Sequence, residues 1–420
     1  MRVQDLKDKK ILILGFGREG KDTLLFLRKY FSKKKIGIAD QKQGSGYLKK
    51  IKDYDVIIKS PGVPNWKIAP FLKKKQVVTS QTDIFFSECP GTIIGVTGTK
   101  GKSTTASMIY GVLRSGGVRA HLLGNIGEPV LSHLAKAKPE DVFVYELSSF
   151  QLENLRKSPH IAVLLNVYPE HLDHHQSHAK YAWAKARIAM YQTPTDFLIY
   201  NQDSKVVSTI AKLSKAQKLP FKLGPTKLST TWSGQVSRPV LASVKPARIV
   251  GELFGIPKQK IERAIKNFKP LEHRLEKVGE WKGITFYNDS LATIPEATVA
   301  ALDALGTNVS TLIAGGYDRG LDMKKLGERI KKSNIKTLIL FPTTGTKILQ
   351  SIKRPPQSFF AKDMKEAVRL AYLHTPKKKI CLLSPAASSF NMFKDYKDRG
   401  EQFKKWVAYY GKRKKISFQA

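Results

Sequence analysis

The chain contains little cysteine and no long apolar run. Its two cysteines, Cys89 and Cys381, lie far apart in a sequence of 420 residues and have no spacing that would suit a metal. That usage fits a reducing cytoplasm, with both thiols structural. No stretch of about 18 apolar residues occurs, so we expect no membrane span. The first ten residues are charged and lead into a strand pattern, without the apolar core of a signal peptide.

Acidic residues are also scarce. The chain has 34 Asp and Glu against 73 Lys and Arg, which gives a formal net charge of +39. Such a field attracts anions, including nucleotides and nucleic acid. The basic residues, however, are spread along the chain in short runs at 33–35, 73–75, 377–379 and 412–415. No basic segment is interleaved with aromatic residues as in single-strand readers, so we favour a solvated lysine-rich surface and expect no specific nucleic-acid partner.

Strand and helix patterns alternate along the chain, which predicts an α/β protein. The length suggests three domains, and 41% hydrophobic residues can supply their cores. We expect an N-terminal Rossmann-like doubly wound domain at 1–90, a central P-loop ATPase-type α/β domain at 91–271 and a C-terminal Rossmann-like α/β domain at 272–420. The expected strands are 11–14, 36–39, 54–58, 92–94, 142–145, 161–165, 283–286, 311–314, 337–340 and 380–383. The stretch 226–240, rich in Ser, Thr, Trp and Pro, is expected to be irregular.

A glycine-rich segment at 95–105 indicates a phosphate-binding loop. It follows the apolar run 92–94 and precedes a helical pattern, the setting in which backbone N–H groups and a helix N-terminus hold a phosphate. Lys102 would reach the outer phosphates, and Ser103 would offer its hydroxyl to Mg²⁺. The strict motif is not met because Val96 stands at its first glycine, so the segment is the variant G-T-x-G-K-S.

A second glycine pattern lies near the N-terminus. Gly15, Gly17 and Gly20 stand between a predicted strand and a predicted helix, and Asp40 follows twenty residues later. This is the spacing of the dinucleotide-binding fingerprint. The Asp40 carboxylate could hold a ribose hydroxyl of NAD or serve another nucleotide, such as a uridine diphosphate, and the loop alone does not decide between them.

Polar residues at the ends of central strands are candidate metal ligands. Glu146 directly follows the strand 142–145, where a magnesium ligand beside a phosphate loop is expected. After the next strand, histidines recur with helical one-face spacing at His171, His174, His175 and His178. A zinc site is conceivable there. No cysteine is near, and the neighbouring Asp and Glu fit a magnesium–nucleotide site as well.

Further candidates depend more strongly on context. Lys185 lies among small and aromatic residues. A lysine whose pKa falls on burial can do covalent chemistry. On local sequence alone, however, a surface lysine on an amphipathic helix is the favoured interpretation. In the last third of the chain, polar turns follow strands at 287–290, 315–320 and 383–390. Each is either a ligand loop or a plain turn.

Taken in order, these motifs resemble the Mur ligase family, the ATP-dependent amide ligases of peptidoglycan precursor synthesis. The resemblance covers essentially the whole chain and rests on 97–105, 124–127, 146–151, 170–173, Lys185, 273–276 and 288–290. Within the family, segments 382–390 and 399–403, Phe393 and the early Gly15-Phe16-Gly17 are similar to the members that add D-glutamate to UDP-N-acetylmuramoyl-L-alanine.

The resemblance implies a defined reaction. The family's ligases transfer the γ-phosphate of ATP to the substrate carboxylate, and an amine then attacks the acyl phosphate to give an amide, ADP and phosphate. Because the first step brings two anions together, two Mg²⁺ ions and a lysine are needed to neutralise charge. The amine needs a site with little water, and groups from different domains imply closure on the substrate. The implied protein is cytoplasmic, and nothing in the sequence suggests more than a monomer.

The resemblance also assigns roles to individual residues. ATP would be bound by Gly98, Thr99, Gly101, Lys102, Ser103 and Thr104, with Arg274, Asn288 and Asp318 from the third domain. Ser103 and Glu146 would bind one Mg²⁺, and His171 and a carbamoylated Lys185 would bind the second. Lys102, Glu146, His171 and Lys185 form the implied catalytic set. Asn125 and Ser148 would contact the muramoyl-alanine end, Gly17, Asp40 and Ser60 the uridine diphosphate, and Arg319, Ser389, Phe390 and Tyr396 the D-glutamate.

The chain departs from the family pattern at several of these places. Lys100 replaces an Asn of the phosphate loop, and Leu291 stands where a Lys commonly follows Asn-Asp-Ser, which affects the expected ATP contacts. Arg319 replaces a frequent Lys and Tyr396 a frequent Phe, which affects the choice of amino acid.

Three other functions remain to be weighed. A folylpolyglutamate-type ligase would lack the N-terminal glycine fingerprint and Asp40. A non-catalytic nucleotide- or nucleic-acid-binding protein, which the net charge would suit, has no need of both metal sites. An NAD dehydrogenase would leave the second phosphate loop without a role.

Overall fold

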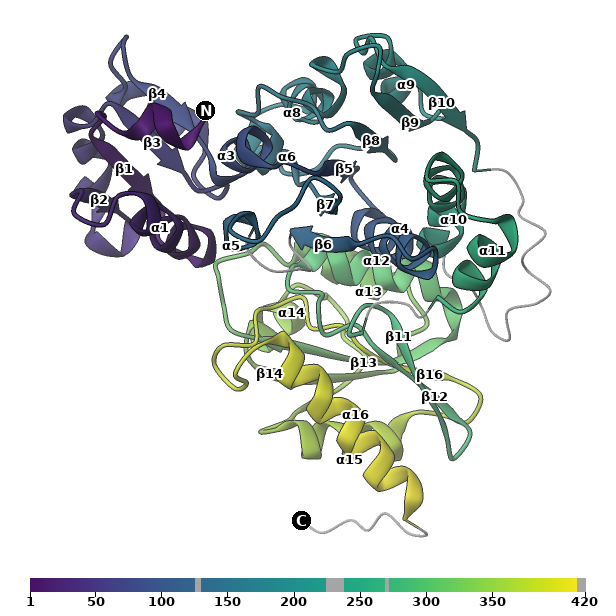
Figure 1. Cartoon of the computed structure of the whole chain (residues 1–420). Coiled ribbons are helices and arrows are strands. Elements are labelled where there is room, and N and C mark those ends of the chain that lie inside the picture. Colours follow the sequence, from purple (N-terminus) through teal and green to yellow (C-terminus); the bar gives the residue numbers. More distant parts are fainter. Residues whose placement is uncertain (125–129, 224–237, 269–271, 414–420) are drawn as a thin grey trace. The chain divides into compact units, whose positions relative to one another are not determined.

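The computed structural model describes residues 1–124, 130–223, 238–268 and 272–413 (Figure 1). The chain divides into two compact units, Met1–Lys269 and Pro270–Ala420. The first unit holds two sheets and the second holds one. The expected α/β class is confirmed, whereas the finer domain boundaries at 90/91 and 271/272 stay a prediction.

The N-terminal sheet is parallel and buried on both faces. Its strands are β1 (Ile11–Leu14), β2 (Ile36–Ala39), β3 (Val56–Lys59) and β4 (Val77–Thr79), in the order β2-β1-β3-β4. The helices are α1 (Arg18–Tyr30), α2 (Asn65–Ile68) and α3 (Gln81–Glu88). Ile11 and Ile13 point into one core and Leu12 and Leu14 into another, as the two-residue period of a strand requires. Continuous apolar strands therefore form here because both faces are covered.

The central sheet contains six parallel strands. They are β5 (Thr92–Thr97), β6 (Ala120–Gly124), β7 (Val142–Glu146), β8 (Ile161–Leu164), β9 (Phe197–Asn201) and β10 (Gln217–Phe221), in the order β10-β9-β8-β5-β7-β6. The helices are α4 (Lys102–Ser115), α5 (Leu131–Leu134), α6 (Ser149–Leu152), α7 (Leu172–His175), α8 (His178–Met190), α9 (Lys205–Ala211), α10 (Arg238–Leu253) and α11 (Lys258–Lys266). The chain turns to opposite sides of β5 when it adds β7 and β8, and ligands bind at such a switch point.

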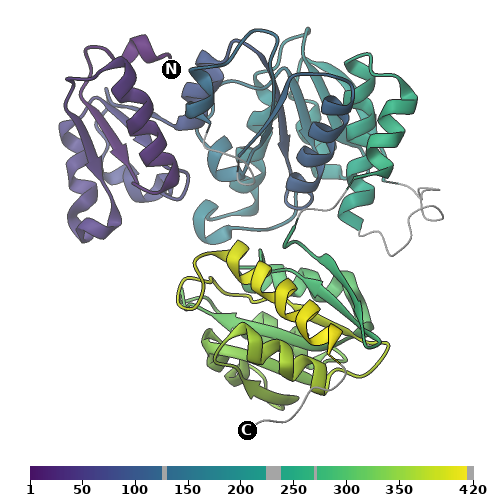
Figure 2. The same cartoon turned by 60° about the horizontal axis from the view of Figure 1, so that its bottom comes forward.

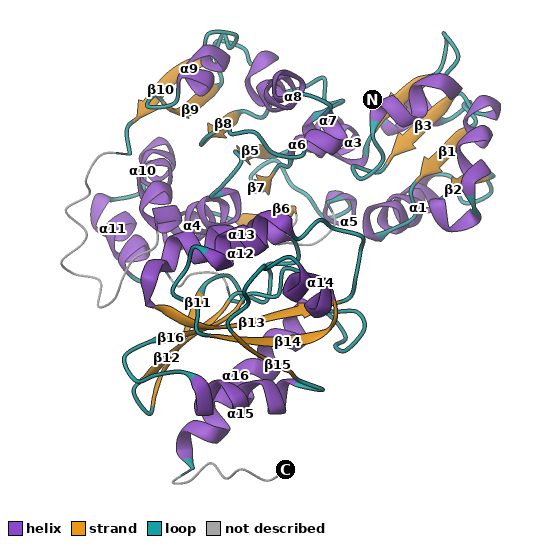
Figure 3. Cartoon of the chain, turned by 180° about the vertical axis from the view of Figure 1, so that it is seen from behind, coloured by secondary structure: helices purple, strands orange, loops and turns teal. Residues whose placement is uncertain are grey.

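The sheet of the second unit is parallel except at one edge (Figure 2). Its strands are β11 (Glu276–Trp281), β12 (Ile284–Asn288), β13 (Val309–Gly316), β14 (Thr337–Thr343), β15 (Gln357–Phe360) and β16 (Ile380–Leu383), in the order β11-β12-β16-β13-β14-β15. Among the described strands of this sheet, the edge strand β11 alone is antiparallel to its neighbour. The helices are α12 (Pro295–Leu305), α13 (Lys324–Lys331), α14 (Thr344–Gln350), α15 (Met364–His374) and α16 (Tyr396–Lys412). Figure 3 shows the strands of all three sheets in orange.

Short helices link many of these elements. Several are 3₁₀ turns, at Val3–Leu6, Gln41–Gln43, Ser45–Asp53, Ala69–Phe71 and Gly306–Asn308. In the part of the chain that the structure describes, no helix combines the length and apolar character needed to cross a bilayer. Most of the stretch 226–240 lies outside the described residues, and α10 begins within it at Arg238.

The glycine fingerprint at the end of β1 gives a stability prediction. A Cβ on Gly20 would lie 2.2 Å from the Gly15 carbonyl oxygen, whereas nothing lies within 4 Å of a Cβ on Gly17. Gly20→Ala is therefore expected to destabilise the protein by about 1–3 kcal/mol, the usual cost of overpacking. Thermal unfolding of the full chain measures this, with Gly17→Ala as the matched control. Equal unfolding temperatures for the two variants would show that α1 can shift away from the Gly15 turn.

Candidate active site

The phosphate loop joins the end of β5 to the start of α4. Gly101 adopts the left-handed conformation at φ 88°, which a residue with a side chain rarely does. A Cβ on Gly98 would lie 2.9 Å from Leu165 Cβ, so the loop packs closely against the segment after β8. Asn166 holds the loop there, because its Oδ1 accepts from Lys100 N at 2.8 Å and its Nδ2 donates to Lys100 O at 3.0 Å.

The start of α4 can bind an anion. The first N–H groups of a helix have no carbonyl partners within it, and the helix dipole favours negative charge there. Ser103 and Thr104 are buried in this first turn. Lys102 Nζ donates to Thr99 O at 3.0 Å, so its ammonium group is folded back over the loop. The segment 98–104 therefore has the backbone and the charge that a nucleotide phosphate needs.

Glu146 ends β7 beside this loop. Since β5 and β7 are parallel and Val96 pairs with Glu146, the two strands finish at the same edge of the sheet. Glu146 is 2% exposed, and its Oε2 is one of the buried side-chain oxygens that has no hydrogen-bond partner among the described residues. A buried carboxylate oxygen without a donor, next to a phosphate loop, fits a Mg²⁺ ligand.

Lys185 is buried, not exposed. It lies on α8 and is 1% exposed, and its Nζ donates to Gly98 O at 2.9 Å and to Thr97 Oγ1 at 3.3 Å. The alternative of a surface lysine is therefore wrong. Burial holds the pKa of Lys185 well below its usual value, and the nearby Lys102 ammonium lowers the pKa further. A buried amine with a lowered pKa is available as a neutral nucleophile.

The four histidines of segment 171–178 do not lie together, and His171 is placed beside the phosphate loop. His171, which precedes α7 in a left-handed conformation, lies 3.7 Å through Nε2 from Glu170 Oε2. The other oxygen of Glu170 accepts from Lys100 Nζ at 2.7 Å. Burial raises the pKa of Glu170, but the hydrogen bond and charge of Lys100, together with the charges of His171 and Lys102, lower it more. Lys100, which stands where the resemblance expects an Asn, thus forms an ion pair with Glu170, the residue before His171.

His174 and His175 lie next to Glu153 instead. Their ligand atoms and a Glu153 oxygen lie within 4.8 Å of one another. His178 and His171 are not part of this group, so the structure does not assemble four histidines around one point. The ammonium group of Lys59 lies 3.5 Å from Glu153 Oε2 and already neutralises this carboxylate. The four histidines therefore do not form together the zinc site that their spacing suggested.

The segment 148–154, shortly after Glu146, connects the central sheet to elements around the N-terminal sheet. Ser148 caps α6, with its Oγ accepting from Gln151 N at 3.2 Å. Later residues of the segment bind side chains of α1, α2 and β3. The pairs are Gln151 Nε2 to Glu19 Oε1 at 3.1 Å, Lys59 Nζ to Glu153 Oε2 at 3.5 Å, and the mutual amide bonds of Asn65 and Asn154 at 2.9 and 3.0 Å. Sequence patterns gave no signal for these pairs, although a lysine ending the apolar strand β3 is unusual.

The N-terminal candidates meet at the carboxyl edge of their sheet. Asp40 Oδ2 accepts from Phe16 N at 2.6 Å, and its Oδ1 accepts from Lys42 N at 3.0 Å. These backbone hydrogen bonds, that from Lys42 first, lower the pKa of Asp40. Ser60 Oγ donates to Gly15 O at 2.8 Å, which brings the turns after β1 and β3 together near Gly17. Asn125 lies outside the described residues.

Two candidates of the second unit already have partners within it. Asn288 ends β12, where its Nδ2 lies 2.9 Å from His273 Nδ1 and 3.1 Å from Glu276 Oε2. The carboxylate of Asp318 pairs with Lys347 Nζ at 2.6 Å, and this hydrogen bond lowers the pKa of Asp318.

The remaining candidates of this unit lie on its turns or, for Tyr396, at the start of a helix. Ser389 is buried, while Phe390 is 71% exposed and Arg319 is exposed. Arg274 is half-buried, and Tyr396 starts α16, where its carbonyl accepts from Ser290 Oγ at 2.7 Å. An antiparallel bridge between Tyr317 and Ser388 joins the turns that follow β13 and β16.

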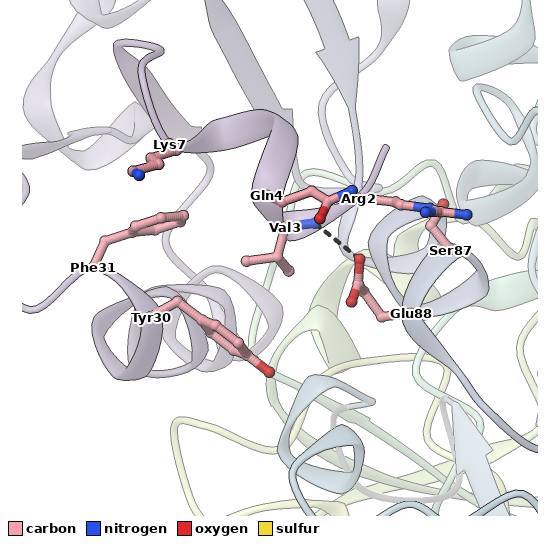
Figure 4. Close-up of a pocket in the computed structure, with 8 residues that line it drawn as sticks. All are labelled: Arg2, Val3, Gln4, Lys7, Tyr30, Phe31, Ser87 and Glu88. Carbon is pink, nitrogen blue, oxygen red and sulfur yellow. Dashed lines mark hydrogen bonds between the residues drawn. The ribbon is translucent and has the colours of Figure 1, made fainter.

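A separate pocket of about 430 Å³ contains none of these candidates (Figure 4). Arg2, Lys7, Tyr30, Phe31 and Glu88 line it, and the backbone N–H of Val3 donates to Glu88 within it at 2.9 Å.

Comparison with known proteins identifies the family. Residues 96–236 match the model of the Mur ligase middle domain, and residues 273–387 match that of the Mur ligase, glutamate ligase domain. A curated relative from Acetivibrio thermocellus is 33% identical over 96% of this chain and 97% of its own length. The chain belongs to the Mur ligase family. That relative, and another from Symbiobacterium thermophilum at 33% identity over 87% of this chain and 86% of its own, are named UDP-N-acetylmuramoylalanine--D-glutamate ligase.

Solved Mur ligases share the fold. The MurF ligase from Thermotoga maritima, described in complex with ADP, covers 97% of this chain and 98% of its own at a TM-score of 0.59 and 16% identity. The UDP-N-acetylmuramate-alanine ligase from the same organism covers 96% and 99% at a TM-score of 0.55 and 16% identity. The expected three-domain layout of a Mur ligase is thereby confirmed.

Proposed function

We propose that this chain is the ATP-dependent ligase that joins D-glutamate to UDP-N-acetylmuramoyl-L-alanine in peptidoglycan precursor synthesis. The observation that carries the proposal is the 33% identity, over nearly the full length of both chains, to a relative of that name. In the proposed reaction, the L-alanine carboxylate takes the γ-phosphoryl group of ATP and releases ADP. The amine of D-glutamate then attacks the acyl carbon, the C–N bond forms and inorganic phosphate leaves.

The central domain has the groups that the first step needs. Segment 98–104 would bind the ATP phosphates through its backbone, and the Lys102 ammonium would hold the charge that builds on the transferred group. Ser103 and Glu146 would hold one Mg²⁺, which fits a Glu146 oxygen that has no hydrogen-bond partner within the described part of the chain. His171 and a modified Lys185 would hold a second. Bound there, the two ions would neutralise the opposed phosphate and carboxylate charges.

The proposed modification of Lys185 is a carbamate. Its amine nitrogen would bond to the carbon of CO₂, and the proton released would pass to water. The lowered pKa of Lys185 supports this step because only the neutral amine reacts. Deep burial also supports it, since the product would be shielded from bulk solvent. The carbamate is an anionic oxygen ligand, which an ammonium cannot be.

The remaining assignments follow the domains. Gly17, Asp40 and Ser60 would bind the uridine diphosphate, and Asn125 and Ser148 the muramoyl-alanine end. Arg274, Asn288 and Asp318 would bind the nucleotide, and Arg319, Ser389, Phe390 and Tyr396 the D-glutamate. We also propose that the protein acts in the cytoplasm and as a monomer.

The direct test is phosphate release by the full-length protein. With ATP, Mg²⁺ and UDP-N-acetylmuramoyl-L-alanine, we expect release with D-glutamate and none above background with L-glutamate, L-lysine or D-alanine. Mass spectrometry should show one added glutamate residue in amide linkage. Release with a different amino acid would reassign the acceptor. A folded protein that binds ATP and releases no phosphate with any of the four would overturn the ligase assignment.

A further inference from the structure

The second unit buries an arginine that no described carboxylate neutralises. Arg399, on α16, is 0% exposed. Its Nε donates to Ser290 Oγ at 3.0 Å, its Nη2 to Ser290 O at 2.8 Å and its Nη1 to Ala387 O at 3.1 Å. All these acceptors are uncharged. Among the described residues, no Asp or Glu oxygen lies within 4.0 Å of the guanidinium.

The charge of Arg399 is therefore poorly compensated inside the protein. Burial alone lowers its pKa to about 9, with no opposing ion pair. Removing a charge from water without a counter-charge costs several kcal/mol. The carboxyl of Asp289, next to Ser290 in the chain, is directed elsewhere, since it accepts from Ser384 Oγ at 2.8 Å and from Leu275 N at 3.1 Å. The guanidinium thus maintains a positive potential at the surface above it.

That surface is formed by three turns at the carboxyl edge of the sheet. Ser290 follows β12, Ala387 follows β16, and a Cβ on Gly316, at the end of β13, would lie 3.4 Å from Arg399 Nη1. The Tyr317–Ser388 bridge joins two of the turns. Ligands of α/β sheets bind at this edge. The same turns carry Arg319, Ser389 and Phe390, the residues proposed to surround the amino acid.

We propose that Arg399 is a positioning residue that also sets the preference for an acidic amino acid. From beneath the turns, its guanidinium fixes their backbone through Ser290 and Ala387, and its uncompensated charge favours an incoming substrate with an additional carboxylate. This inference rests on the proposed function, because it deepens the choice of amino acid at that same site.

The test compares D-glutamate with D-glutamine, which has an amide in place of the side-chain carboxylate. For Arg399→Gln in the full chain, the ratio of kcat/KM for D-glutamate to that for D-glutamine should fall about tenfold, through KM for the amino acid. KM for ATP and for the nucleotide sugar should stay within about twofold, since those sites lose no charge. Arg399→Lys keeps the charge but lacks the planar fork, so kcat should fall while the ratio is kept.

Lys397→Gln is the matched control. Lys397 is exposed on the first turn of the same helix, where water screens its charge, and the ratio should not change. A ratio unaltered in Arg399→Gln would overturn the inference and leave the ligase assignment intact. If Arg399→Gln does not fold, a ratio kept in Arg399→Lys supports the role of charge and a lost ratio contradicts it. A wild-type protein that does not use D-glutamate would instead overturn the proposed function.

Discussion

Replacement of Lys185 by methionine is expected to lower the ligation rate by more than about a hundredfold, the scale for losing a group that stabilises transition-state charge. Lys185 is buried against the phosphate loop, with its Nζ 2.9 Å from Gly98 O. Methionine fills similar volume but cannot become an anionic metal ligand. The measurement is phosphate release at saturating substrates, with ATP binding as evidence that the loop remains folded.

A further variant, with a control on the same helix, distinguishes a carbamate from a simple cation at position 185. Lys185→Arg keeps a positive charge but cannot be carbamoylated in the same way, so it should be as inactive as Lys185→Met. Lys180→Met, at an exposed position on the same helix, should keep full activity. Isotopically labelled bicarbonate should give a carbamate carbon signal in wild type and not in Lys185→Met. Full activity in Lys185→Arg would show that the cation itself is required.

The second large effect is expected at Glu146. Glu146→Gln removes a charge but keeps the size of the side chain, and it should lower kcat by about a hundredfold or more and raise the Mg²⁺ concentration needed for half-maximal rate. The physical reason is that Oε2, which no described residue hydrogen-bonds, would no longer be part of an anionic ligand. Phosphate release measured against Mg²⁺ concentration gives both quantities.

Glu140→Gln is the control for this substitution. Glu140 lies just before the other end of the same strand, and its side chain is 61% exposed, far along β7 from the phosphate loop. It should leave the Mg²⁺ dependence unchanged. An unchanged Mg²⁺ dependence in Glu146→Gln would mean that the orphaned oxygen is simply an unsatisfied group of the fold.

The parts of the fold that depend on local sequence could be predicted well. Strands β1, β2 and β16 match their expected ranges because each is a short apolar run bounded by charged or turn residues. β13 extends beyond the expected 311–314 to Gly316, because two glycines with positive φ let the strand continue past a register shift. The end of such a strand is set by pairing with a neighbouring strand, which local sequence does not encode.

The site was predictable only where a short motif carries it. The strand–loop–helix arrangement of 92–105 follows from glycine spacing, and Glu146 follows from its place at a strand end. The burial of Lys185 depends on how α8 packs against β5, so local sequence alone wrongly favoured a surface lysine. Arg399 stood out only as part of the family-like segment 399–403. Its burial and hydrogen bonds were not predictable, because its acceptors at Ser290 and Ala387 are brought to it from loops distant in the chain.

The segment 148–154 has a consequence for modular exchange between relatives. Three of its last four residues bind side chains of the first 65 residues, directly after the strand that ends in Glu146. An N-terminal domain taken from another Mur ligase would therefore meet side chains that here pair with Glu19, Lys59 and Asn65. If only the N-terminal domain were exchanged, Glu153 would lose its ion pair with Lys59. A chimera that keeps these contacts therefore exchanges segment 148–154 together with the domain.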